Sequence, residues 1–248
     1  MVSAVRGLRA LFESETGAIT YADLEFRVTE RRQQRLATRE YMLKRGMDMV
    51  LATIGLVVAA PIWLAIAAAV KLEDRGPVFY MQNRWGRHGR PFRVYKFRSM
   101  VPDADKKFGA VQARENDPRF TRVGRILRVT SLDEMPQLLN IWRGQMSWVG
   151  PRALPINERQ VNDTAEVPDD AVEGFDLRCS VRPGLTGIAQ IFAPRDVSRR
   201  HKFRYDRFYI ERQSFWLDAK LIVLSCWISV RGRWENRGQK LSGRRRGR

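Results

Sequence analysis

The chain has 248 residues, enough for one domain of ordinary size with tails, and 44% of them are hydrophobic. A chain of this composition can bury a core, which excludes a wholly disordered protein. Its 45 Lys and Arg against 27 Asp and Glu give a net charge of +18. Such a charge attracts nucleic acid, anionic lipid or phosphorylated substrates without choosing among them. The two cysteines, Cys179 and Cys226, are far apart, so neither a disulfide framework nor a zinc site is expected.

The N-terminal region, residues 1–43, reads as a basic extension. Met1 to Ala10 lacks the long apolar core of a signal peptide. Tyr21 to Leu43 is rich in Arg, Glu and Gln with scattered apolar residues, which predicts a basic, partly amphipathic helix. The role of this extension is left unassigned.

Residues 44–72 are predicted to enter a membrane. Met49 to Val70, about 22 residues, carries no charged side chain and as a helix would cover roughly 33 Å, the thickness of a bilayer core. A buried core helix is the alternative. Lys and Arg flank the run equally on both sides, whereas a single crossing favours one side. Pro61 near its middle favours a sharp bend. We therefore predict a re-entrant helix that breaks at Pro61 and leaves by the face it entered, with a straight span as the alternative.

Residues 73–230 are predicted to form one small domain that follows the membrane segment. Phe92, Val94 and Tyr95 indicate a short strand, preceded by a hairpin turn at Gly86 and Gly89. The apolar run 215–230 is short for a span and favours a helix lying in the membrane interface. Residues 231–248 read as a disordered basic tail held to anionic lipid. The predicted fold class is α+β and predominantly helical, with amphipathic interfacial helices.

Two adjacent carboxylates, Asp133 and Glu134, are the most suggestive local feature. Apolar residues at helical spacing predict a helix over 131–143, with Ser131 as its N-cap and both acids in its first turn with Pro136. Neighbouring helix residues diverge by about 100°, so the two acids suit different tasks. One could serve as nucleophile or metal ligand, and the other as orienting group or proton carrier. Stabilisation of the helix dipole is the structural alternative.

Cationic residues surround this pair along the sequence. Arginines next to Pro and Gly in rigid turns form fixed forks that can clamp phosphate oxygens. Carboxylates with such cations can also hold a diphosphate and Mg²⁺, which binds through one or two carboxylates plus substrate phosphates. A solvated basic face is the alternative reading. The cations in question are Lys96, Arg98, Arg122, Arg125, Arg128, Arg152 and Arg182.

From Lys44 to about Asp218 the chain resembles the bacterial sugar transferase family, the monotopic phosphoglycosyl transferases that act on polyprenol phosphate. Five runs in the family's order carry the resemblance: KRGMD, GPVFYMQNRWGRHGRPFRVYKFRSM, TSLDEMPQLLNIWRGQMSWVGPR, RPGLTGIAQI and FWLDAKLIVL. The resemblance also implies a membrane-embedded enzyme at the cytoplasmic face of the bacterial inner membrane, with residues 73–230 as its small cytoplasmic catalytic domain. Its re-entrant helix with a mid-helix proline corresponds to Pro61.

The resemblance implies a two-step transfer. A carboxylate attacks the β-phosphate of a nucleotide diphosphosugar, expected to be a UDP-sugar, and releases the nucleoside monophosphate. Undecaprenyl phosphate then takes the sugar phosphate, which starts synthesis of an exopolysaccharide or related glycan. Carried onto this chain, Asp133 is the nucleophile and Mg²⁺ ligand and Glu134 its partner. The expected phosphate-binding residues are Lys96, Arg98, Arg128, Arg152 and Arg182.

This chain departs from the family pattern at two places. Ala153 follows Arg152 where many relatives have proline, which predicts a less rigid turn. Ala60 precedes Pro61 in place of a hydroxyl residue. Larger relatives carry four additional spans before this region, and residues 1–43 contain none, as expected for the short form.

Two other functions fit parts of the sequence. Asp103-Ala104-Asp105 could serve as the metal motif of a nucleotide-sugar glycosyltransferase, which would release UDP. The charge also permits a membrane-tethered nucleic-acid binder, but no recognition motif is present, so no nucleic-acid partner is expected. The identity of the sugar, the glycan pathway and the oligomeric state are left open.

Overall fold

The computed structural model describes residues 21–102, 104, 117–156, 169–193 and 199–230, with side chains at 41–102, 104, 117–156, 169–193 and 202–229. Contacts divide the chain into two units, residues 1–45 and 46–248. Within these described ranges helices dominate, accompanied by two small sheets, which confirms the predicted helix-rich α+β class. The predicted basic tail and the Asp103 and Asp105 carboxylates lie outside the described residues.

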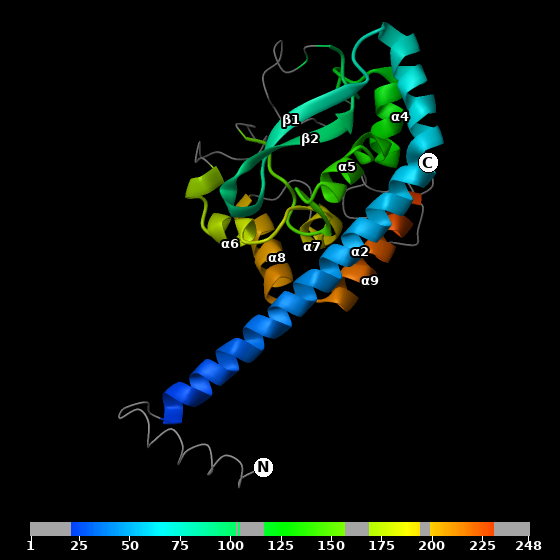
Figure 1. Ribbon diagram of the computed structural model, residues 1–248. Coiled ribbons are helices and arrows are strands. Elements are labelled where there is room, and N and C mark those ends of the chain that lie inside the picture. The colour runs from blue at the N-terminus through cyan, green and yellow to red at the C-terminus, as the bar shows by residue number, and fades with distance from the viewer. Residues whose placement is uncertain (1–20, 103, 105–116, 157–168, 194–198, 231–248) are drawn as a thin grey trace, which may run out of the picture. The chain divides into compact units, whose positions relative to one another are not determined.

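Helix α2 runs from Tyr21 to Asp74 with Pro61 inside it. Its stretch Tyr41–Asp74 is long and apolar enough to cross a membrane, by length and composition. Proline offers no N–H and its ring crowds the carbonyl four residues earlier, so a helix bends there. Figure 1 shows α2 bending along its light-blue to cyan part while remaining one helix. The predicted break at Pro61 is not observed, because Pro61 lies inside one continuous helix.

The apolar part of α2 has two different sides. One side is buried at Ala52, Ala59, Ile66 and Val70. The other exposes large apolar side chains: Met49, Val50, Ile54, Val57, Val58, Ile62 and Leu64. An exposed apolar strip of this extent is typical of a surface that contacts lipid or another protein.

Strands β1 (Phe79–Trp85) and β2 (Pro91–Phe97) form an antiparallel hairpin, in register from Phe79 opposite Phe97 to Trp85 opposite Pro91. The 3₁₀ turn η1, Arg87–Gly89, connects them, and Gly89 has a φ of 65°. Glycine adopts this left-handed conformation without steric cost. The predicted strand and hairpin turn are confirmed.

Helix α4 (Arg122–Thr130), the 3₁₀ turn η2 (Leu132–Glu134) and helix α5 (Gln137–Trp142) follow. Helix α5 packs against the hairpin (Figure 1). The buried Asn140 amide accepts a hydrogen bond from the Tyr95 N–H (3.1 Å) and donates one to the Arg93 carbonyl (2.7 Å). This side chain satisfies the free edge of β2, as a third strand would, and so fixes α5 beside the hairpin.

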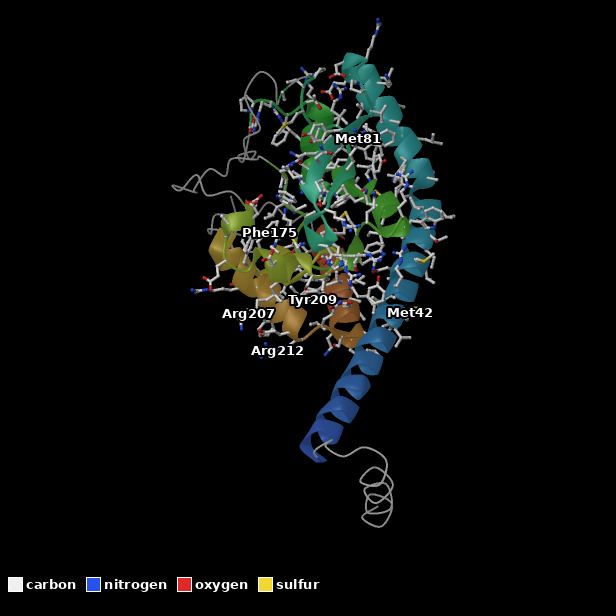
Figure 2. All side chains as sticks on the ribbon, turned by 60° about the vertical axis from the view of Figure 1, so that its left-hand side comes forward. Met42, Met81, Phe175, Arg207, Tyr209 and Arg212 are labelled. Atoms are coloured by element: carbon white, nitrogen blue, oxygen red, sulfur yellow. The ribbon has the colours of Figure 1, made fainter. Side chains whose placement is uncertain are left out.

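A second, parallel sheet pairs β3 (Ser147–Val149) with β4 (Gly184–Thr186). The remaining elements are η3 (Asp169–Ala171), α6 (Phe175–Cys179), α7 (Ile188–Phe192), α8 (Arg199–Glu211) and α9 (Phe215–Val230). Helix α9 matches the predicted range. Val149 packs in one apolar core with residues of α7, α8 and α9, among them Tyr209, which Figure 2 labels.

Buried polar contacts join the helices to β3. The Asp48 carboxylate of α2 accepts hydrogen bonds from the Ser147 hydroxyl (3.1 Å) and the Trp148 N–H (3.0 Å). The Tyr209 hydroxyl lies 2.8 Å from an Asp218 carboxylate oxygen and 3.1 Å from the Val149 carbonyl. Strand β3 is thus held by α2, α8 and α9 just before the chain reaches the Gly-Pro-Arg turn.

Candidate functional site

The adjacent acids lie in a 3₁₀ turn between two helices, not in the first turn of one long helix. Ser131 ends α4 in the left-handed conformation, with φ 59° and ψ 18°, and its side chain makes no capping hydrogen bond. Ser131 therefore precedes the turn that carries both acids, as predicted, but its side chain does not cap that turn. A single helix over 131–143 does not form, because Pro136 has no N–H to donate to the carbonyl of Leu132, which disfavours an α-helix through this point. Helix α5 begins only at Gln137.

Asp133 is almost fully buried, with 3% of its surface exposed. Burial raises the pKa of its carboxyl, and the charge of Glu134 acts in the same direction. The cationic groups of Lys96, Arg128 and Arg152 oppose that rise. A carboxylate held away from water among cations is poorly solvated and therefore suited to attack an electrophile or bind a metal ion.

Glu134 has the opposite electrostatic environment. Burial disfavours its charge, but Lys96 and Arg152 outweigh that effect and hold the pKa of the carboxyl well below its usual range. The Lys96 ammonium donates a 2.7 Å hydrogen bond to Glu134 Oε1, and an Arg152 guanidinium nitrogen lies 3.8 Å from the same oxygen. Two neighbouring acids with pKa values displaced in opposite directions can take different roles in one reaction.

Lys96 reaches the acids from β2. Its side chain is buried, and burial lowers the pKa of the ammonium although Glu134 and Asp133 both favour its charge. Burying a charged lysine costs free energy unless its ammonium group is paired. The ion pair with Glu134 therefore both stabilises this lysine and joins the hairpin to the turn that carries Asp133.

Arg84 is a site residue that the sequence reasoning missed. Its buried guanidinium acts electrostatically on both Glu134 and Lys96. The hairpin register contained the signal: Tyr80 pairs with Lys96 and Arg84 with Phe92, so Arg84 and Lys96 project from the same face of the sheet. The hairpin turn was predicted from the sequence without bounds for the strand before it, so this register could not be drawn.

The Gly-Pro-Arg turn after β3 brings Arg152 to the pair. Gly150 and Gly184 lie back to back, since a Cβ at Gly184 would be 2.1 Å from the Gly150 nitrogen. A β-bridge joins Arg152 to Gly184, which follows Arg182 and Pro183. The Arg182 side chain donates from Nε to the Gly144 carbonyl (2.6 Å). The two predicted arginine turns are thus adjacent, and Arg152 is the one whose guanidinium approaches Glu134.

Two other predicted phosphate ligands have different surroundings. Arg98 makes a bidentate pair with Asp74 at the end of α2, and Gly76 leaves the space that its guanidinium occupies. Arg128 stacks its guanidinium 5.0 Å from the centre of the Phe120 ring and acts electrostatically on Asp133. Arg128 therefore belongs to the surroundings of Asp133, while Arg98 ties β2 to α2. Phosphate binding by either arginine stays a prediction.

The Asp133 carboxylate is suited to a divalent cation that takes most of its ligands from water and the substrate. Among the described residues, no three His, Cys, Asp or Glu side chains cluster as a complete metal site. Mg²⁺ commonly takes only one or two protein carboxylates and completes its shell with water and substrate phosphates. The buried Asp133 carboxylate fits that pattern, because a divalent cation would offset the cost of its charge.

Comparisons with known proteins show which family the chain resembles. The family model described as "Bacterial sugar transferase" matches residues 39–232. "UDP-glucose:undecaprenyl-phosphate glucose-1-phosphate transferase" of Escherichia coli (strain K12) is 43% identical over 192 residues, covering 74% of this chain and 39% of that protein. "Exopolysaccharide production protein ExoY" of Rhizobium meliloti (strain 1021) is 40% identical over 195 residues, covering 73% of this chain and 82% of that protein.

A third relative carries a different sugar in its name. "UDP-N-acetylgalactosamine-undecaprenyl-phosphate N-acetylgalactosaminephosphotransferase" of Aeromonas hydrophila is 39% identical over 183 residues, covering 73% of this chain and 42% of that protein. The chain thus spans about two fifths of the Escherichia coli and Aeromonas relatives and most of the Rhizobium one. The family model covers well over half of the chain, and the apolar stretch Tyr41–Asp74 of α2, the hairpin and the Asp133 turn all lie inside the match. This chain belongs to the bacterial sugar transferase family.

Proposed function

We propose that this chain transfers a sugar phosphate from a UDP-sugar to undecaprenyl phosphate. The observation that carries the proposal is the environment of the acid pair: Asp133 buried with a raised pKa, beside Glu134 held ionised by Lys96 and Arg152. Relatives named for undecaprenyl-phosphate sugar-phosphate transfer support the substrate class. The exopolysaccharide relative supports a role in starting the synthesis of such a glycan.

The proposed reaction has two displacement steps. In the first, a carboxylate oxygen of Asp133 forms a bond to the β-phosphorus, and the bond from that phosphorus to the bridging oxygen breaks. The leaving UMP keeps the bonding electrons. In the second, a phosphate oxygen of undecaprenyl phosphate attacks the same phosphorus, and Asp133 leaves as a carboxylate. The product is an undecaprenyl diphosphosugar.

The surrounding residues have separate roles in this proposal. Glu134 holds Lys96 and Arg152 in place, and these cations oppose repulsion between the anionic nucleophile and the anionic substrate. We assign phosphate contacts to Arg152 and Arg182 in the two adjacent turns, and a supporting charge to Arg128. Mg²⁺ held by Asp133 and the substrate phosphates would supply further neutralisation of the diphosphate charge.

The nucleotide product tests this function. Detergent-solubilised protein is incubated with Mg²⁺, undecaprenyl phosphate and a panel of UDP-glucose, UDP-galactose and their N-acetylated counterparts, with a parallel series in excess chelator. We expect UMP with at least one donor and no UMP in chelator. Release of UDP would instead support a glycosyltransferase, and UMP release that persists in chelator would contradict the Mg²⁺ assignment.

We propose further that α2 inserts its exposed apolar side into one leaflet and returns both ends to the cytoplasmic face. Residues at both ends of the apolar run contact the same unit of the chain. Asp48 bonds to Ser147 and Trp148, whereas Glu73 accepts hydrogen bonds from the N–H groups of Arg122 (2.6 Å) and Val123 (3.2 Å). One compact unit cannot lie on both sides of a bilayer, which supports the re-entrant arrangement over a straight span.

Cysteine labelling tests this topology. Single cysteines replace Leu43 and Leu72, which are 51% and 86% exposed, after the exposed Cys226 is changed to serine. A membrane-impermeant maleimide is expected to label both positions in inside-out vesicles and neither in right-side-out vesicles. Labelling of the two positions from opposite sides would rule out the re-entrant helix.

Arg152→Lys is expected to lower turnover by about tenfold to a hundredfold. Lysine keeps the charge but loses the planar fork that grips phosphate oxygens in two places. The matched control is Arg207→Lys on α8, where the arginine is 69% exposed and pairs with Glu211. UMP release by the control should equal that of the wild type. Equal activity of both variants would show that Arg152 supplies charge alone.

A further inference from the structure

Four consecutive carbonyls in the turn that carries Arg152 each accept a hydrogen bond from a different group. The Pro151 carbonyl accepts from the Gly184 N–H (2.8 Å), and the Leu154 carbonyl from the Trp85 N–H (2.9 Å). Between them, the carbonyls of residues 152 and 153 accept from two arginine side chains. Arg178 Nη2 donates to the first (2.7 Å) and Arg84 Nη1 to the second (2.6 Å).

Both of these arginines are buried, Arg178 with 5% and Arg84 with 7% of its surface exposed. A buried guanidinium is costly unless its donors are satisfied. Arg178 is fixed by the buried Asp206 carboxylate of α8 (3.2 Å) and lies 4.5 Å from the centre of the Phe203 ring. Arg84 also bonds to the Gln82 side-chain oxygen (2.9 Å). Arg178 of α6 is thus anchored by α8, and Arg84 by a residue of its own strand β1.

We propose that Arg178 and Arg84 are positioning residues that hold the main chain at 152–153 and thereby aim the Arg152 guanidinium at the acid pair. The Arg152 side chain is itself 50% exposed, so its own packing does little to fix it. The hydrogen bonds from Arg178 and Arg84 to this main chain also restrain the turn, as a proline at position 153 would. This inference rests on the proposed function, because the position of Arg152 is expected to affect the rate of sugar-phosphate transfer.

A double-mutant cycle tests the inference. Arg178→Lys keeps a positive charge for Asp206, but a single ammonium cannot bond to both that carboxylate and the Arg152 carbonyl in the same geometry. We expect Arg178→Lys to lower kcat for UMP release by up to about a hundredfold, as a small misplacement of a substrate-binding group does. In an Arg152→Ala background the same change should have almost no further effect.

Arg119→Lys is the matched control. Arg119 is also a buried arginine that pairs with a buried aspartate, Asp117, at 2.7 Å. This ion pair includes no residue of the Arg152 turn. Its effect on kcat, whatever its size, should be the same factor in the wild-type and Arg152→Ala backgrounds. If Arg178→Lys does not fold, Arg84→Lys addresses the same turn from β1 and should show the same loss of effect in the Arg152→Ala background.

The outcomes separate the two proposals. Active wild-type protein in which the Arg178→Lys and Arg152→Ala effects multiply would overturn the positioning role and leave the proposed function intact. Wild-type protein that releases no UMP with any donor would overturn the proposed function, and this inference with it. Coupling seen for Arg178→Lys and not for Arg119→Lys supports the inference.

Discussion

Asp133→Asn is expected to lower UMP release by about 10⁴-fold or more, the scale of loss seen when a nucleophile is removed. An amide at this position cannot form the proposed bond to phosphorus. The variant should fold at least as well as the wild type, because the native carboxylate is buried and burial penalises its charge. Turnover and the thermal midpoint are measured on the same detergent-solubilised preparation.

Asp176→Asn is the control for this change, since Asp176 is an exposed aspartate on α6. It makes the same chemical substitution away from the acid pair and should retain wild-type turnover. Substantial UMP release by Asp133→Asn would remove Asp133 as the nucleophile. A large fall in the thermal midpoint of that variant would instead indicate that the carboxylate stabilises the fold.

Gly184→Ala is expected to destabilise the protein by about 3 kcal/mol, a typical cost of forcing extra atoms into a packed interior. A Cβ there would lie 2.1 Å from the Gly150 nitrogen and 2.4 Å from the Thr186 carbonyl oxygen. Both neighbours are main-chain atoms of the β3–β4 region, so the strands must separate to make room. Because the turn to Arg152 begins at Gly150, turnover should fall as well.

Gly46→Ala provides the comparison, since a Cβ at Gly46 meets no atom within 4 Å. Gly46 lies inside α2, where alanine is favoured over glycine by up to about 1 kcal/mol. The thermal midpoint should therefore rise slightly for Gly46→Ala and fall strongly for Gly184→Ala. Similar midpoints for the two variants would show that the close approach of Gly150 and Gly184 is not required.

The elements with strong local signals could be predicted from the sequence. The charge-free run of α2, the apolar run of α9 and the glycines of the hairpin turn each have a local physical cause, and the structure has helices and a turn there. The turn at Asp133 was predicted less well. Ser131 is a common N-cap residue, but the effect of Pro136 on the preceding turn outweighed it, and Ser131 became the left-handed end of α4.

Contacts between distant segments could not be read from spacing. Lys96 and Arg152 are far from Glu134 in the sequence, and only the hairpin and the β3–β4 pairing bring them to its carboxylate. Arg98, two residues after Lys96 on the same run, pairs with Asp74 instead. Lys96 and Arg98 were grouped because they are close along the chain, but their side chains pair with different acids.

The phosphorylated intermediate offers the most direct test of the central proposal. Wild-type protein is incubated with Mg²⁺ and the accepted UDP-sugar without undecaprenyl phosphate, quenched, digested and analysed by mass spectrometry. We predict one sugar phosphate on the peptide that contains Asp133, matched by an equal amount of UMP and lost when undecaprenyl phosphate is added before the quench. Full turnover with no adduct on that peptide, or with the sugar phosphate attached to a different residue, would contradict the proposed role of Asp133.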